Sequence, residues 1–131
     1  MKVNEIELNF SDKGEGSPIL LLHGLALDKR IWEPLIQAYA SQARFITPDL
    51  RGHGKTELGN ADGSLGQIAE DLRVLLDALA LEKVSIAGHS MGGYIALEFA
   101  KRYSERLNSL ILVTSNIRPD SDEKKAGRIR D

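Results

Sequence analysis

Apolar residues along this chain fall into segments with two different spacings, and the two kinds of segment alternate. Four short segments are rich in aliphatic side chains, as strands are. These segments are residues 18–22, 44–48, 83–87 and 107–114. Three longer segments place apolar side chains three or four positions apart, as one face of a helix does. These segments are residues 31–40, 64–79 and 91–103. Strands that alternate with helices predict a mainly parallel sheet with helices on both faces.

The N-terminal residues follow a different pattern, because apolar and polar side chains mix over residues 3–10. This mixture predicts an antiparallel strand at the sheet margin, followed by a turn over 11–17. The whole pattern predicts an α/β fold, a three-layer sandwich with a mostly parallel sheet of about six strands. We interpret residues 1–131 as a single domain. It has a long loop over 49–63 and a charged tail over 118–131 that is either frayed or helical.

Two predicted helices have capping residues near their starts. Ser64 precedes Gln67 by three positions, which predicts a capping box at the start of the helix over 64–79. Asp28 lies just before the helix over 31–40 and is a candidate cap for it.

Composition and charge exclude several classes of function. The chain has 17 basic and 19 acidic residues, so the sequence predicts no basic surface for nucleic acid. It has no cysteine, which removes disulfides, thiolate nucleophiles and cysteine-based zinc sites. The first residues lack the apolar stretch of a signal peptide, and apolar runs such as 19–22 are too short to cross a bilayer. We therefore expect a cytoplasmic protein with no membrane or nucleic-acid partner.

The segment Gly88-His89-Ser90-Met91-Gly92 has the form G-x-S-x-G and lies between a predicted strand and a predicted helix. This context predicts that Ser90 sits on a sharp turn, with its hydroxyl projecting from the sheet edge. Gly88 and Gly92 are expected where a Cβ would collide with the neighbouring helix and strand. The helix N-terminus after Ser90 would offer free N–H groups to a developing oxyanion. The pattern predicts a nucleophilic serine, and a glycine-rich turn with a capping serine is the alternative.

Three motifs in this order and spacing resemble the α/β-hydrolase superfamily, and the resemblance covers nearly the whole chain. They are Leu22-His23-Gly24-Leu25, the loop from Asp49 to Thr56 (D-x-R-G-x-G-x-S in the family) and Gly88 to Gly93. The resemblance implies that Ser90 attacks a small ester, lactone or similar acyl substrate. It also implies that the backbone N–H groups of Leu25 and Met91 hold the oxyanion, with no metal or organic cofactor. The nearest likeness is to small bacterial esterases, enol-lactonases and related C–C hydrolases, and the sequence does not choose among them.

The loop over 49–56 also supports a weaker hypothesis, a phosphate or nucleotide site, because Gly54-Lys55-Thr56 resembles the end of a P-loop. That motif requires glycine at position 49, where this chain has Asp49, and a helix directly after the loop. Residues 57–63 are instead full of helix breakers. We therefore reject the nucleotide site and interpret Asp49 and Arg51 as structural residues.

A catalytic serine needs a histidine base that is oriented by a carboxylate. The family places both groups after the nucleophile, whereas His23, His53 and His89 all precede Ser90 in this chain. His23 and His89 are candidates for a substitute base or for lining the site, and a structural role is the alternative. We interpret the chain as the N-terminal half of a truncated α/β-hydrolase fold, with weak or lost activity.

The strand over 107–113 would be internal in a complete sheet and is expected to be an open edge here. Exposed apolar edges tend to pair with another strand. The sequence therefore predicts a homo-oligomer, such as a two-fold dimer joined through this strand. A catalytically idle half-hydrolase that acts as a self-associating folding or binding module is the competing hypothesis.

Overall fold

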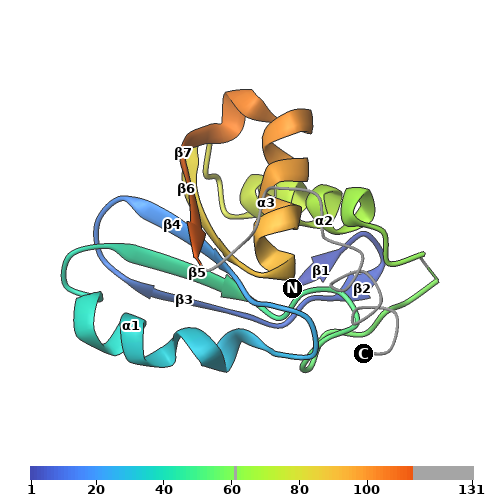
Figure 1. Cartoon of the computed structure of the whole chain (residues 1–131), viewed down its shortest axis with the longest axis horizontal. Helices are drawn as coiled ribbons and strands as arrows, with labels where there is room; N and C mark the ends of the chain where they lie inside the picture. Colours follow the sequence, from blue (N-terminus) through green and yellow to red (C-terminus); the bar gives the residue numbers. More distant parts are fainter. Residues whose placement is uncertain (61, 114–131) are drawn as a thin grey trace, which may run out of the picture.

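A five-stranded sheet forms the centre of the molecule in the computed structural model, which describes residues 1–60 and 62–113 (Figure 1). The strands are β3 (Phe10–Gly14), β4 (Pro18–Leu22), β5 (Arg44–Pro48), β6 (Val84–His89) and β7 (Leu107–Val113). Their order in the sheet is β3-β5-β4-β6-β7. β3 runs antiparallel to β5, and the other neighbouring pairs are parallel. The predicted parallel α/β sheet is confirmed, with five strands in this sheet rather than about six.

Helices cover both faces of the sheet, which confirms the predicted three layers (Figure 1). They are the 3₁₀ turn η1 (Lys29–Trp32), α1 (Glu33–Tyr39), α2 (Leu65–Ala78), α3 (Met91–Arg102) and the 3₁₀ turn η2 (Ser104–Arg106). α1 packs on one face, whereas α2 and α3 pack on the other. Thr114 of the last predicted strand and the tail over 118–131 lie outside the described residues.

The predicted strand over 3–10 and the predicted turn over 11–17 are wrong. Residues 2–7 form a small hairpin, β1 (Lys2–Val3) and β2 (Ile6–Glu7), which is separate from the main sheet. Its turn residues Asn4 and Glu5 both have positive φ, 44° and 69°. Val3 and Ile6 are an odd number of positions apart, so a straight strand would place them on opposite faces. The reversal at the turn lets both side chains be buried.

The edge strand β3 occupies part of the predicted turn. Its middle residues are polar, and Asp12 and Lys13 are exposed, as an edge strand allows, so no apolar pattern marks this strand in the sequence. Asp12 of β3 accepts hydrogen bonds from the Arg44 guanidinium of β5, at 2.9 Å to Nε and 2.6 Å to Nη2. An antiparallel strand does lie at the margin of the sheet, as predicted, but it spans Phe10–Gly14 and not residues 3–10.

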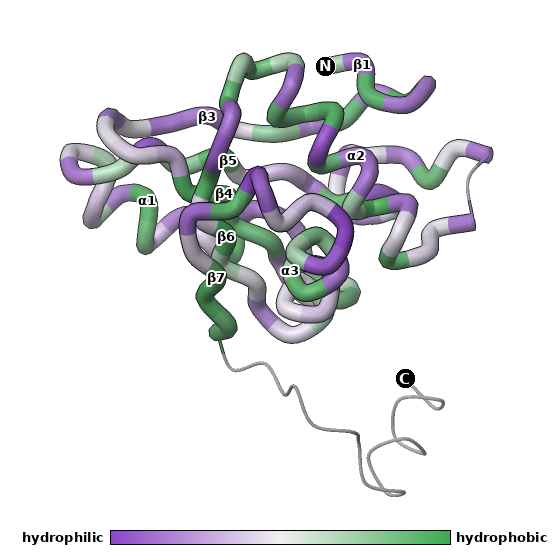
Figure 2. Tube along the Cα trace, turned by 90° about the horizontal axis from the view of Figure 1, so that it is seen from above, coloured by the Kyte–Doolittle hydropathy of each residue, from purple (hydrophilic) through white to green (hydrophobic). Residues whose placement is uncertain are grey.

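Alternate residues of the central strands fill two cores, one on each face of the sheet. Leu20 and Leu22 of β4 face the larger core, where the apolar faces of α2 and α3 pack. Leu21 faces the smaller core, with Trp32 and Ile36 from η1 and α1. Figure 2 shows apolar residues concentrated along the central strands, with hydrophilic residues in the connecting loops. Strands that are buried on both faces explain why their sequences are continuously apolar.

The predicted caps are partly confirmed. The Ser64 hydroxyl accepts a hydrogen bond from the Gln67 N–H at 3.1 Å, as predicted for the start of α2. The reciprocal half of the capping box is wrong, because the Gln67 side chain donates to Asp71 instead. Asp28 caps η1 by accepting from the Arg30 N–H at 2.9 Å.

Candidate active site

Ser90 occupies the single-residue connection between β6 and α3. Its backbone has φ 55° and ψ −115°, a conformation that non-glycine residues rarely adopt. The Ser90 carbonyl accepts a hydrogen bond from the Gly93 N–H at 2.8 Å, so the chain enters the helix directly after it. A residue held in such a conformation by the surrounding structure is typical of functional sites.

The glycines on either side of Ser90 allow this sharp turn. A Cβ on Gly88 would overlap the backbone carbonyl of Gly92 at the start of α3. A Cβ on Gly92 would in turn overlap the carbonyl of Leu22 at the end of β4. The packing reason predicted for Gly88 and Gly92 is therefore confirmed, because both are in contact with rigid backbone.

The loop that follows β4 lies against the elbow. A Cβ on Gly24 would be 3.3 Å from the Ser90 Cβ and 3.1 Å from Nδ1 of His89. The peptide that carries the Leu25 N–H is thus next to Ser90, and the Leu25 side chain is exposed. Met91 is the first residue of α3, where backbone N–H groups have no carbonyl partner within the helix. The two segments that the resemblance assigns to the oxyanion hole therefore meet at Ser90.

His23 is completely buried and uses both of its ring nitrogens. Nδ1 lies 2.8 Å from the Gly24 carbonyl oxygen, and Nε2 lies 3.0 Å from the Leu50 backbone nitrogen. Burial lowers the pKa of His23 below its usual value of 6.5, and the nearby His53 ring lowers it further, against the opposing effect of the Gly24 carbonyl. The structure thus places His23 beside the site, in surroundings that favour its neutral form.

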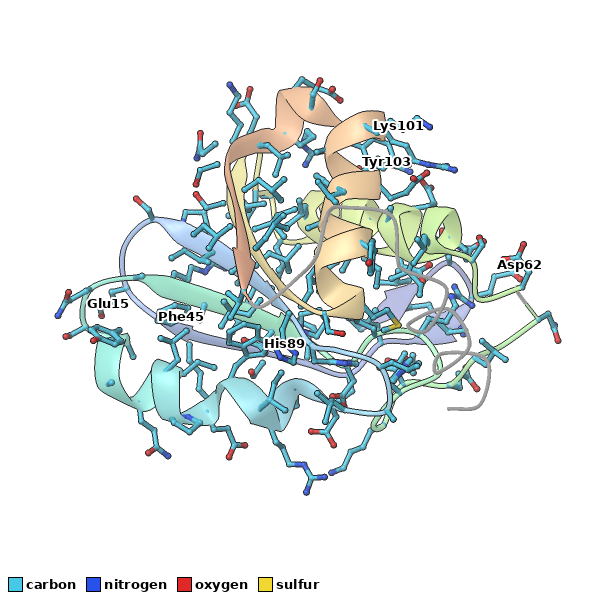
Figure 3. All side chains as sticks on the ribbon, in the orientation of Figure 1. Glu15, Phe45, Asp62, His89, Lys101 and Tyr103 are labelled. Carbon is cyan, nitrogen blue, oxygen red and sulfur yellow. The ribbon has the colours of Figure 1, made fainter. Side chains whose placement is uncertain are left out.

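His89 and His53 have different surroundings. His89 ends β6 and lies close to the start of α3 (Figure 3). Its Nδ1 is buried and has no hydrogen-bond partner among the described residues. The His53 ring packs against the His23 ring, with 5.1 Å between centroids, and its Nδ1 is 3.1 Å from the Arg51 carbonyl oxygen. His23 and His89 are therefore close to Ser90 through Gly24, while His53 supports His23 from the loop after β5.

Asp49 organises the loop after β5. Its carboxylate accepts hydrogen bonds from the Lys29 N–H at 2.8 Å, the Lys55 N–H at 3.0 Å and the Asn9 side chain at 2.7 Å. Burial acts to raise the pKa of Asp49, but these donors outweigh it and hold the pKa below its usual value. A Cβ on Gly54 would overlap this carboxylate. An internal carboxylate thus occupies the loop that the P-loop hypothesis offered to a phosphate.

Arg51 forms a buried ion pair with Asp71 of α2. The Arg51 Nε and Nη2 donate to the two carboxylate oxygens at 2.7 Å and 2.8 Å, and both side chains are nearly inaccessible to solvent. The structural role predicted for Asp49 and Arg51 is confirmed by these contacts. The sequence interpretation missed Asp71, although its place between Ile68 and Leu72 on the buried face of α2 was a signal that it needs a partner.

Over residues 1–60 and 62–113, no three His, Asp or Glu side chains gather in a way that could hold a metal ion. In the same ranges no helix has the length and apolar character needed to cross a bilayer.

Comparisons with known proteins identify the family to which this chain belongs. A family model described as "alpha/beta hydrolase fold" matches residues 17–129. The chain is 32% identical over 126 residues to a putative carbamate hydrolase, RutD, from Azorhizobium caulinodans, covering 96% of this chain and 48% of that protein.

Two solved structures are similar to this chain over nearly its whole length. A thermophilic esterase from Thermogutta terrifontis is 42% identical with a TM-score of 0.86, covering 95% of this chain and 46% of that one. The enol-lactonase from Burkholderia xenovorans LB400 is 29% identical with a TM-score of 0.87, covering 98% of this chain and 51% of that one. The chain spans about half the length of each of these three relatives.

Proposed function

Because the chain belongs to the α/β-hydrolase family, we propose that it carries the nucleophile and the oxyanion donors of a serine hydrolase for small acyl substrates. In this proposal the Ser90 hydroxyl attacks the carbonyl carbon of an ester, lactone or similar substrate. The backbone N–H groups of Leu25 and Met91 hold the oxyanion of the tetrahedral intermediate. Substrate class is suggested by the relatives, which include an esterase and an enol-lactonase.

One observation carries this proposal: Ser90 has a strained backbone directly beside the Gly24 peptide. A serine that only capped a helix would need neither the positive φ nor a second loop packed against it. Preorganised N–H donors near a nucleophile contribute strongly to acyl transfer, since removing one such donor costs on the order of 10²–10³ in rate.

We expect Ser90 to react slowly in this chain on its own, because no histidine follows it in the given sequence. Of the two local candidates for a base, His23 is the weaker, since both of its ring nitrogens already have partners. His89 keeps a ring nitrogen with no partner among the described residues and remains the local candidate. An oxyanion hole without an activated base still supports a residual acceleration on the order of 10³ over water.

The test is covalent labelling with a fluorophosphonate probe, which reacts with activated serines. We expect slow labelling of wild-type protein, because no histidine follows Ser90, and no labelling of Ser90→Ala. Ser109→Ala is the matched control, because Ser109 is an exposed serine of β7 that hydrogen-bonds Ser85 at 2.7 Å, and it should label like wild type. Absence of labelling in wild type, or equal labelling of Ser90→Ala, contradicts a nucleophilic role for Ser90.

A second candidate, an idle self-associating module, has one observation in its favour. β7 is the last strand of the sheet among the described residues, it has no charged residue, and the Ile111 side chain is 46% exposed. If the chain is such a self-associating module, light scattering at micromolar concentration should give a dimer or larger species. Ile111→Lys should then lower the measured mass of the particles. A monomer together with serine labelling would favour the hydrolase.

A further inference from the structure

We propose that His23 is the positioning residue of the oxyanion donor at Leu25, because it holds the carbonyl of the same peptide group. This inference rests on the proposed role of Ser90 and of the Leu25 N–H. In this role His23 transfers no proton. Its imidazole instead determines the direction in which the Leu25 N–H points.

The hydrogen bonds of His23 determine where its proton lies. The Leu50 backbone N–H can only donate, so Nε2, at 3.0 Å, must accept with its lone pair. A neutral imidazole that accepts at Nε2 carries its proton on Nδ1. Nδ1 therefore donates to the Gly24 carbonyl oxygen at 2.8 Å. A ring with both nitrogens used in this way has no lone pair left for the Ser90 hydroxyl.

The planarity of the peptide connects this contact with the oxyanion donor. The Gly24 carbonyl and the Leu25 N–H belong to one peptide group, and a trans peptide points its C=O and N–H in opposite directions. The structure has no cis peptide among its described residues. When Nδ1–H of His23 fixes the direction of the carbonyl, it also turns the Leu25 N–H away from His23. The Ser90 Cβ lies close by, 3.3 Å from the position of a Cβ on Gly24.

His23 also joins the oxyanion loop to the end of β5. The loop over 24–29 is attached at its beginning to Leu50 through His23, and at its end to Asp49 through the Lys29 N–H. Two adjacent residues after β5 thus anchor both ends of the loop. The Leu27 N–H shares the Gly24 carbonyl at 3.2 Å, but a contact within the loop cannot fix its direction relative to the sheet. The hydrogen bond from His23 Nδ1 fixes the direction of this carbonyl relative to the sheet, because His23 is also bound to Leu50.

Two substitutions separate the two halves of the imidazole. In His23→Asn the amide nitrogen takes the place of Nδ1 and can donate to the Gly24 carbonyl, whereas the contact with Leu50 is lost. In His23→Gln the amide oxygen takes the place of Nε2 and can accept from Leu50, whereas the donor to Gly24 is lost. We expect the fluorophosphonate labelling rate of His23→Gln to fall by about 10²-fold, the scale of a lost oxyanion donor. We expect His23→Asn to be labelled faster than His23→Gln, because its amide still donates to the Gly24 carbonyl.

Urea unfolding of both variants controls for stability. If labelling follows stability rather than the presence of a donor to Gly24, His23 is a structural residue and the proposal is overturned. Equal labelling losses in the two variants, or wild-type labelling of His23→Gln, overturn it as well.

Nitrogen NMR of wild-type protein gives a readout that needs neither a variant nor a reactive serine. A proton found on Nδ1 of His23 supports the proposal, and a proton found on Nε2 overturns it. If wild type is not labelled at all, the proposed function fails, and the Leu25 amide resonance then decides the positioning role. That resonance should shift in His23→Gln and stay near its wild-type position in His23→Asn, and the opposite result overturns the inference.

Discussion

The buried carboxylate of Asp71 joins three parts of the chain that are distant in sequence. It accepts two hydrogen bonds from Arg51 in the loop after β5, one from the Asn4 side chain in the β1–β2 turn and one from Gln67 in its own helix. The Arg51 Nη1 further donates to the Leu58 carbonyl at 2.8 Å. Replacing Asp71 by asparagine keeps the shape of the side chain but removes its charge.

We expect Asp71→Asn to destabilise the fold by about 3 kcal/mol or more, because removing one partner of a buried ion pair typically costs about 3–5 kcal/mol. The side chains of Arg51 and Asp71 are only 2% and 1% exposed, so water cannot solvate the guanidinium that is left. The new amide group also presents hydrogen-bond donors to a group that only donates. The exposed pair Arg44–Asp12, with side chains 31% and 30% accessible, is the matched control. Asp12→Asn is expected to cost at most about 1 kcal/mol.

Urea unfolding followed by tryptophan fluorescence measures both variants. Trp32 is the single tryptophan of the chain, and it is buried in the smaller core. With a slope of about 1–3 kcal/mol per molar urea, a loss of 3 kcal/mol moves the midpoint by about 1–3 M. If Asp71→Asn unfolds at the wild-type midpoint, or no earlier than Asp12→Asn, the reasoning from burial is refuted. Replacing Arg51 and Asp71 together by apolar residues should cost less than Asp71→Asn alone.

Two further predictions concern the start of α2 and the response to acid. Ser64→Ala removes the cap that accepts from the Gln67 N–H, and it should lower the free energy of unfolding by about 1 kcal/mol in the same assay. A midpoint equal to that of wild type would show that the cap contributes nothing. His23 has a lowered pKa in the fold, so the unfolded chain takes up its proton first as the pH falls. The stability that neutral His23 contributes is complete above about pH 6.5 and declines below it, and His23→Asn should lack this part of the decline between about pH 7 and pH 5.

The sequence predicted the central strands and the helices well because burial on one or both faces imposes a strict spacing there. Ile68, Leu72 and Leu75 of α2 and the run over 18–22 illustrate this. The prediction for the N-terminal region was wrong for a physical reason. β1 and β2 are two residues each, and the turn at Asn4 and Glu5 has no glycine to mark its positive φ.

The parts of the site that depend on residues close together in sequence could be predicted. The elbow at Ser90 could be predicted from residues 88–92 together with the predicted strand before them and the predicted helix after them. The partners of His23 could not be predicted, because Leu50 is 27 positions away and contributes only a backbone N–H, which every non-proline residue has. Asp71 was missed because an acidic residue in a helix usually faces solvent. Its place on the apolar face of α2 indicated burial, but its partner Arg51 lies 20 positions away and could not be read from that spacing.

The order of the strands also determines where a ligand can approach. After β4 the chain turns to β5 on one side of it, with α1 on one face of the sheet. After β6 the chain turns to β7 on the other side, with α3 on the opposite face (Figure 1). β4 and β6 are neighbours, so their connections leave the same sheet edge in opposite directions. Open α/β sheets bind their ligands at such topological switch points. We therefore expect the position of Ser90 at this edge of the sheet to survive side-chain changes that leave the strand order intact.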